Sequence, residues 1–246
     1  WLKGGATALR MPWRDFGLGA VGGLIGYYVA GLLDFTALEM IDVSVERVLL
    51  FSFPVFVLLL DGLRRRRPPP RRQILALILA EAGIIMVMGV TDPAIFFANL
   101  EGGLFAIASA FAFAIYFMMN QSLGPRLGSA RMALAAVAGA TLGIDLHFVA
   151  FASFDSLAMS GTAWLLIVAM AIFCSVVPFL LVTEGIRRVG AARSALISTV
   201  GPVATLGLAA LVLDEVLTFE QLAGAGLVIG SVMALEGRLP RWRRKA

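Results

Sequence analysis

Ionisable side chains that interrupt long apolar runs are the first candidates for chemistry. Asp34 lies within one such run, and Arg47 lies near the start of the next. A charge at the centre of a membrane-spanning helix costs about 2.5–3.5 kcal/mol, so it persists there only for a reason. Helical spacing places Tyr27 and Asp34 on one face, and Phe51 on the face of Arg47. These residues could line a polar cavity and anchor a ligand by charge, or Arg47 could pair with Asp34 or Glu46 to hold two helices together.

A second candidate is a stripe of polar and aromatic residues in the run that begins near Leu100. Ser109, Phe113, Tyr116 and Asn120 follow each other at intervals of four, three and four residues, which is one face of a helix. Such a face suits an amphipathic ligand. The same groups could instead form hydrogen bonds between packed helices.

Three prolines lie inside apolar runs, at Pro54, Pro178 and Pro202. Each frees a backbone carbonyl group, which a membrane tolerates where it faces protein or a cavity. The prolines could therefore be hinges, ligand contacts or fixed kinks. Three hydroxyl residues lie close to them and could bind the freed carbonyls or a ligand: Ser175, Ser198 and Thr199.

Other polar residues favour structural roles. Glu81 could couple a proton, although a protonated structural carboxyl is the favoured interpretation. Asp145 and His147 indicate an interfacial polar patch, and Glu184 indicates an ion pair with Arg187 and Arg188. The glycine pairs Gly19–Gly23, Gly22–Gly26 and Gly226–Gly230 predict close helix packing. The single cysteine, Cys174, excludes a disulfide framework, and neither metal-ligand spacing nor a phosphate loop occurs.

The elements that carry these residues are long and apolar. Of 246 residues, 60% are hydrophobic and 15% are charged. A soluble domain has about 45–50% apolar residues, so lipid must be part of the solvent. A spanning helix needs roughly 20 apolar residues. Eight runs qualify, at Phe16–Leu38, Ser44–Leu63, Gln73–Val90, Leu100–Gln121, Arg131–Phe151, Thr162–Ile186, Ala192–Leu213 and Gln221–Leu235. Turn residues separate them, including Pro68–Pro70, Gly124–Pro125 and Ser160–Gly161.

Basic residues fall on alternate connections between these runs. With eight alternating spans, every Lys and Arg except Arg47 lies on one side of the membrane. The excess of positive charge on the inner side predicts that both ends of the chain are cytoplasmic. The same short clusters give the chain its net charge of +4. They indicate topology and contact with the lipid bilayer, not binding of nucleic acid.

The chain matches itself at a displacement of 148 residues. This displacement places Pro54–Val55 on Pro202–Val203 and Gln73 on Gln221 without a gap. The matched helices cross the membrane in opposite directions, which is the inverted repeat of many secondary transporters. The pattern predicts a truncated first repeat of three helices, 1–98, and a second of five, 99–246. By this count about 50 residues, enough for two helices, are missing from a full protein of ten helices.

One segment carries a resemblance to a known family. It runs from Gly190 through Gly201-Pro202 to Leu213-Asp214-Glu215 and Gln221-Leu222-Ala223-Gly224. It resembles the C-terminal half of EamA-type members of the drug/metabolite transporter superfamily. Asp214 stands where the family usually has Gly, and Arg64–Arg67 stand where the first repeat often has a Gly-Glu turn. Tyr27-Tyr28, Val45-Glu46-Arg47 and Phe51–Pro54 are similar to a bacterial subgroup.

The resemblance implies an all-α polytopic membrane bundle that exports or exchanges a small metabolite, such as an amino acid or a related amphipathic compound. The basic connections predict a multi-pass protein of the inner (cytoplasmic) membrane. We expect neither a cofactor nor a metal, and no enzyme, because the chain has one His and one Cys. A homodimer is left open, as are a membrane-embedded enzyme and a channel. The first, second, fourth, sixth and seventh runs are expected to enclose the substrate. The expected substrate-binding residues are Tyr28, Asp34, Arg47, Phe51, Phe113, Tyr116, Asn120, Ser175, Ser198 and Thr199, with Pro54, Pro178 and Pro202 as hinges.

Overall fold

A computed structural model describes residues 11–88, 100–154, 158–212 and 217–236, and the regular elements within these ranges are all helices. The terminal basic residues and the segment Asp214–Val216 lie outside the described residues. Two compact units are recognised. Unit 1 comprises Trp1–Leu32 and Ala112–Ser194, and unit 2 comprises Leu33–Phe111 and Ala195–Ala246.

The helices follow the predicted runs closely. They are α1 (Trp13–Gly23), η2 (Leu24–Val29), α2 (Ala30–Leu38), α3 (Val43–Leu50), α4 (Phe53–Arg65), α5 (Arg71–Val87), α7 (Leu100–Leu127), α8 (Ser129–Phe151), α9 (Gly161–Met170), η4 (Ala171–Val176), α10 (Val177–Val189), α11 (Ala191–Ser198), α12 (Val200–Val212) and α13 (Phe219–Glu236). The elements η2 and η4 are short π-helical turns inside longer helices.

Six helical segments of the described chain are long and apolar enough to cross a membrane. They are Trp13–Leu38, Val43–Arg65, Leu100–Leu127, Ser129–Phe151, Gly161–Val189 and Ala191–Val212. The shorter helices α5 and α13 coincide with the remaining two predicted runs. The prediction of a polytopic helical membrane protein is therefore confirmed, whereas the count of eight spans stays a prediction.

One predicted boundary was wrong. Gly124-Pro125 does not end the fourth run, because α7 continues through Pro125 to Leu127. The turn occurs at Gly128, whose φ of 76° lies in the left-handed region that glycine enters without strain. A proline near the end of a helix removes only one backbone hydrogen bond, so the glycine with positive φ fixes the actual end.

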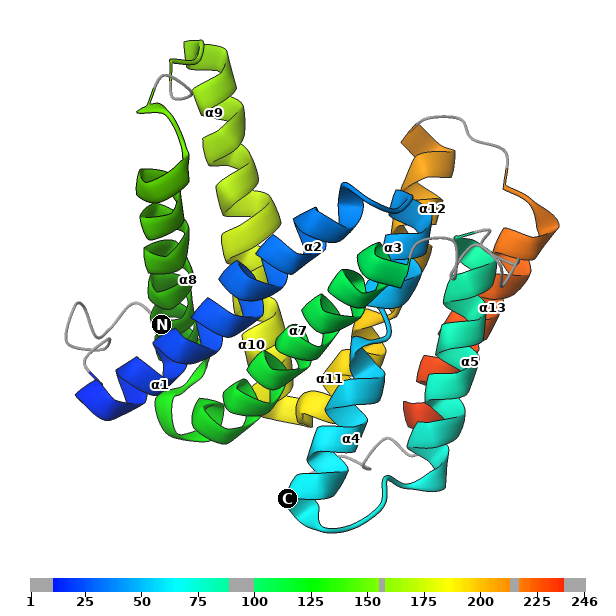
Figure 1. Cartoon of the computed structure of the whole chain (residues 1–246). Helices are drawn as coiled ribbons and strands as arrows, with labels where there is room; N and C mark the ends of the chain where they lie inside the picture. Colours follow the sequence, from blue (N-terminus) through cyan, green and yellow to red (C-terminus); the bar gives the residue numbers. More distant parts are fainter. Residues whose placement is uncertain (1–10, 89–99, 155–157, 213–216, 237–246) are drawn as a thin grey trace, which may run out of the picture. The chain divides into compact units, whose positions relative to one another are not determined.

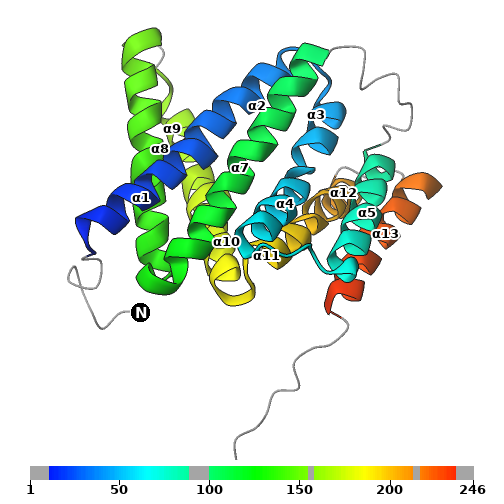
Figure 2. The ribbon, with the colours of Figure 1, turned by 60° about the horizontal axis from the view of Figure 1, so that its bottom comes forward.

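In unit 1, α1 crosses α8 at very short range. A Cβ atom on Gly23 would lie 1.8 Å from the carbonyl oxygen of Ala136, and one on Gly139 would lie 1.9 Å from that of Ala20. Only glycine permits backbones to approach so closely, as predicted for the glycine pairs of the first run. Figure 2 shows α1 and α8 crossing in this way, and α10 also packs on α8.

In unit 2, α5 and α13 lie side by side and antiparallel (Figure 1). A Cβ on Gly83 would lie 2.7 Å from the carbonyl oxygen of Gly224, and the reverse holds for Gly224. The prediction for Gly226 and Gly230 was wrong, because no described atom lies within 4 Å of a Cβ on either residue. Gly224 faces α5 instead, since it lies on a different side of α13. The buried core of this region comprises Val45, Val48, Ile84 and Val228.

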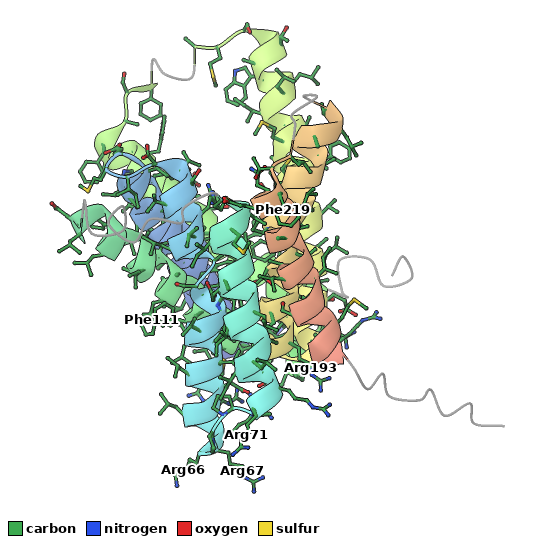
Figure 3. The ribbon with its side chains drawn as sticks, turned by 90° about the vertical axis from the view of Figure 1, so that its right-hand side faces the viewer. Arg66, Arg67, Arg71, Phe111, Arg193 and Phe219 are labelled. Atoms are coloured by element: carbon green, nitrogen blue, oxygen red, sulfur yellow. The ribbon has the colours of Figure 1, made fainter. Side chains whose placement is uncertain are left out.

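The two ends of unit 2 differ in charge. Arg66, Arg67 and Arg71 gather where α4 ends and α5 begins, at the end opposite to Phe219, the first residue of α13 (Figure 3). Arg66 itself adopts a left-handed conformation, with φ 51°, and ends α4. The cluster lies at the connection for which the sequence predicts a cytoplasmic location.

Candidate functional site

The polar stripe of α7 meets an aromatic cluster inside unit 1. Tyr27 of η2 lies at its centre, with ring centroids 5.8 Å from Phe113, 4.9 Å from Tyr116 and 4.4 Å from Phe179. Tyr116 is fully buried, and a Cβ on Gly26 would lie 2.3 Å from that of Tyr116. Gly26 thus lets η2 lie directly against the α7 stripe.

A chain of hydrogen bonds runs through this cluster. The amide Nδ2 of Asn120 donates to the Tyr116 hydroxyl at 3.0 Å, and that hydroxyl lies 3.3 Å from the Thr183 hydroxyl. Thr183 donates to the Phe179 carbonyl at 2.8 Å. Asn120 is fully buried, and its Oδ1 atom has no hydrogen-bond donor among the described residues. Buried acceptors usually have a partner, so this oxygen is a candidate contact for a ligand. We call Tyr27, Phe113, Tyr116, Asn120, Phe179 and Thr183 the aromatic–amide cluster.

The other predicted residues of unit 1 lie elsewhere. The Tyr28 hydroxyl lies 3.0 Å from Nδ1 of His147 on α8 and takes no part in the aromatic–amide cluster. Ser175 lies in η4 and Pro178 in the first turn of α10, and both are exposed. Glu184 forms ion pairs with Arg187 and Arg188, both at 2.5 Å, as the sequence predicted.

Unit 2 brings together three charged residues. The Nε atom of Arg47 lies 3.2 Å from Oε2 of Glu46, which confirms one of the predicted ion pairs. Glu46 has no exposed surface, and the Asp34 carboxyl is its neighbour within hydrogen-bonding range. Both oxygens of Glu46, and Oδ1 of Asp34, are buried without a hydrogen-bond donor in the described part of the chain. We call Asp34, Glu46 and Arg47 the charged triad.

Two helix breaks accompany the prolines of unit 2. The chain leaves helical geometry at Phe51 and Ser52, and Pro54 follows in the first turn of α4. The Ser52 hydroxyl donates to the Leu49 carbonyl at 2.6 Å. Similarly, Thr199 separates α11 from α12, its hydroxyl donates to the Leu196 carbonyl at 2.7 Å, and Pro202 lies in the first turn of α12. The carbonyl that Pro202 frees belongs to Ser198, four residues earlier, so the bond to Leu196 leaves the predicted role of Thr199 untested.

Sequence reasoning placed Phe113, Tyr116 and Asn120 on one face, and unit 1 brings them together. It placed Asp34 and Arg47 near each other, and unit 2 contains both in the charged triad. It missed Phe179 and Thr183, whose spacing of four residues on one helix was the available signal. Glu46 entered only as a partner of Arg47, because an acidic residue next to a basic one normally indicates a simple ion pair. Phe51 packs on the unit 2 core, and Ser198 lies next to the α11–α12 break.

Comparison with known proteins identifies the family. The model of the EamA-like transporter family matches residues 100–236. An uncharacterised transporter of Bacillus subtilis (strain 168), YcbK, is 30% identical over 220 residues, which cover 88% of this chain and 70% of the relative. An uncharacterised transporter of Archaeoglobus fulgidus is 24% identical over 84% of this chain and 70% of the relative.

A crystal structure of a protein superposes on 94% of this chain and 79% of its own with a TM-score of 0.76. Its sequence is 20% identical, so this likeness concerns the fold alone. The family, its relatives and the apolar helices agree that this is a multi-pass membrane transporter, and the chain belongs to the EamA-like transporter family.

Proposed function

We propose that the protein is a secondary transporter that exports or exchanges a small amphipathic metabolite, an amino acid or a related amine, by alternating access. The observation that supports this proposal is the buried Oδ1 of Asn120, which has no donor among the described residues, in a cluster where Nδ2 of Asn120 donates to Tyr116 and Tyr116 packs on Tyr27. A buried acceptor without a donor costs about 1–3 kcal/mol. A substrate that supplies an N–H donor recovers that free energy on binding.

The chemistry of the aromatic–amide cluster selects the class of substrate. An ammonium group donates to the amide oxygen and is attracted to the negative faces of neighbouring rings, which contributes about 0.5–2 kcal/mol. The rings also cover an apolar side chain. Tyr116 and Asn120 are buried in this structure, so the cluster is occluded, and α7 must move relative to η2 or α10 for substrate to enter.

The geometry of helices in unit 2 supports an inverted repeat of eight spans. In Figure 1, α4 runs downward and α12 runs upward, while α5 and α13 also run in opposite directions. The break before Pro54 and the break before Pro202 occur at equivalent positions of the 148-residue repeat. The same displacement moves η2 to residues 172–177, one residue from η4 at Ala171–Val176. These paired breaks support the proposed hinges, because inverted-repeat transporters commonly have discontinuous helices at the substrate site.

The location follows from charge. Arginines gather at the end of α4 and the start of α5, which supports a cytoplasmic location for that connection and an inner-membrane location for the protein. Both ends of the chain then lie on the same side. The proposed partners of the protein are the substrate and the lipid bilayer, and a homodimer is compatible with this topology.

The unit 2 candidates contribute independently of the aromatic–amide cluster. Asp34, Arg47, Phe51, Ser198 and Thr199 remain proposed contacts for substrate, and Pro54 and Pro202 remain proposed hinges, as does Pro178 in unit 1. Arg47 keeps 37% of its side chain exposed, so its guanidinium group can bind an anionic group of a substrate while it pairs with Glu46.

Uptake by the intact protein in sealed liposomes tests the proposal. A panel of labelled amino acids, amines and uncharged analogues should give flux above that of empty liposomes for amphipathic compounds with an amino group. Asn120→Leu should reduce that flux about tenfold or more, because loss of a hydrogen bond to a charged group costs about 1.5–3 kcal/mol.

Ser122→Ala is the matched control. Ser122 lies two residues from Asn120 on the same helix, is exposed, and donates to the Met118 carbonyl of its own helix. It should transport like the parent protein. Equal flux by Asn120→Leu and the parent would show that the amide serves helix packing and that the substrate binds elsewhere.

A further inference from the structure

The charged triad carries more negative than positive charge in a buried location. Two carboxylates and one guanidinium leave one uncompensated negative charge next to Glu46, whose side chain has no exposed surface. A low-dielectric surrounding makes such a charge costly unless it is neutralised. One added proton makes the triad neutral.

The hydrogen-bonding pattern points to the same proton. Three carboxyl oxygens of the pair, both of Glu46 and Oδ1 of Asp34, are buried without a donor among the described residues. The Nε atom of Arg47 lies 3.2 Å from Oε2 of Glu46, which is an ion pair, but it forms no hydrogen bond with either Glu46 oxygen. Two neighbouring carboxyl groups commonly share one proton, because the protonated member then donates to the ionised one.

The charged groups around the triad do not supply another cation that would compensate its negative charge. Asp42 and Glu39 lie just before α3 in the chain and are exposed. Glu101 at the start of α7 and Glu220 at the start of α13 are exposed as well. Helix α5 packs on α3 and carries Glu81, whose Oε1 is also buried without a donor, while its Arg71 and Arg72 lie at the start of the helix. Helix α12 has no ionisable residue. Glu81 is therefore the group to be distinguished from the pair.

We propose that Asp34 and Glu46 hold one proton between them and that its release and rebinding couple transport to the proton gradient. In the bound state one carboxyl is protonated and donates to the other. Release leaves both ionised beside Arg47, with one net negative charge. The shared proton stands on the geometry of the triad alone, whereas its coupling to transport rests on the proposed function.

Infrared spectroscopy of the intact protein in lipid nanodiscs tests the shared proton without any substrate. A protonated carboxyl gives a C=O stretching band that carboxylates lack, and the band shifts in deuterium oxide. The parent protein should show such a band at neutral pH and lose it at alkaline pH. Because one proton is shared, Asp34→Asn and Glu46→Gln, each made in a Glu81→Gln background that removes any band of Glu81, should each remove the whole remaining band. Each leaves one carboxylate neutralised by Arg47.

Glu81→Gln is the comparison and should leave the band of the pair in place. Each variant must first show cooperative thermal unfolding, and where one carboxamide variant does not fold the other decides. Persistence of the band in a folded Asp34→Asn or Glu46→Gln variant would overturn the shared proton, as would its absence from the parent at neutral pH.

Uptake in proteoliposomes tests the coupling separately. With the parent, an imposed pH gradient should change substrate uptake several-fold relative to equal pH on both sides. Glu46→Gln should lose that response. A shared proton in a protein without any flux would refute the transporter and leave the pair intact, whereas flux with an unchanged pH response in Glu46→Gln would refute the coupling alone.

Discussion

At the scale of single residues, the informative atoms are polar groups in apolar helices without partners. Oδ1 of Asn120, both carboxyl oxygens of Glu46, Oδ1 of Asp34 and Oε1 of Glu81 are buried in this way. A membrane offers no water to satisfy them. We therefore propose Asn120 as a substrate contact and the Asp34–Glu46 pair as a proton site.

Arg47→Ala tests the charged triad as a structural element. The substitution leaves Glu46 and Asp34 without their cation, so we expect the free energy of unfolding to fall by roughly 1–3 kcal/mol, below the range for fully buried pairs. Arg65→Ala is the matched control, because Arg65 is 63% exposed and pairs with Asp61 at the rim. Its effect should stay under about 1 kcal/mol. Equal losses of unfolding free energy for the two substitutions would show that Arg47 contributes no more than an exposed ion pair does.

Tyr116→Phe separates hydrogen bonding from packing in the aromatic–amide cluster. It removes the hydroxyl that accepts from Asn120 but keeps the ring, and hydrogen bonds in membranes average about 0.6 kcal/mol. We expect a small loss of stability and a clear loss of transport. Tyr116→Ala should in addition cost about 3–5 kcal/mol, because Tyr116 is fully buried. Full transport by Tyr116→Phe would restrict the hydroxyl to a structural role.

At the scale of elements, glycine decides which helices can meet. The contact of α1 with α8 exists because Gly23 and Gly139 have no side chains to separate the backbones. The contact of α5 with α13 depends on Gly83 and Gly224 in the same way. Helix α1 continues directly into η2, which lies against the α7 stripe, and α5 also packs on α3, the helix that carries Glu46.

Gly23→Ala tests the α1–α8 contact. A methyl group there would lie 1.8 Å from the Ala136 carbonyl oxygen, so the helices must separate at a cost of about 1–3 kcal/mol. Gly17→Ala on the same helix is the control, since nothing lies within 4 Å of its Cβ position. It should leave the melting temperature unchanged or raise it slightly through helix propensity. Unchanged melting of Gly23→Ala would contradict the close crossing.

The sequence predicts the positions of the helices but not the contacts between them. Helix positions followed from hydropathy, because a run of apolar residues has few alternatives in lipid; the Phe151 boundary was predicted to the residue. Contacts between helices did not follow. The pairing of Thr183 with Tyr116, and the choice of Gly224 over Gly226 as the contact residue of α13, depend on the rotation of each helix. Apolar residues all around a helix leave that rotation unspecified.

At the scale of the whole molecule, successive connections between the spanning helices should lie on alternate sides of the membrane. Single cysteines placed in a Cys174→Ser background test it with an impermeant maleimide added outside intact cells. Ser160→Cys, before α9, should be labelled, and Arg67→Cys, between α4 and α5, should be labelled only after the membrane is opened. Both positions are exposed in the structure. External labelling of Arg67→Cys would reverse the topology or change the number of spans.

The central claim is that the protein carries a solute by alternating access, and counterflow measures this most directly. Liposomes with the intact protein are loaded with an unlabelled amphipathic amine and diluted into a trace of the labelled compound. A carrier that exposes one site alternately to each side should concentrate the label inside transiently before it equilibrates, and Asn120→Leu should abolish this overshoot. Label that only equilibrates would indicate a channel, and label recovered in a chemically altered form would indicate an enzyme; either result would contradict the account.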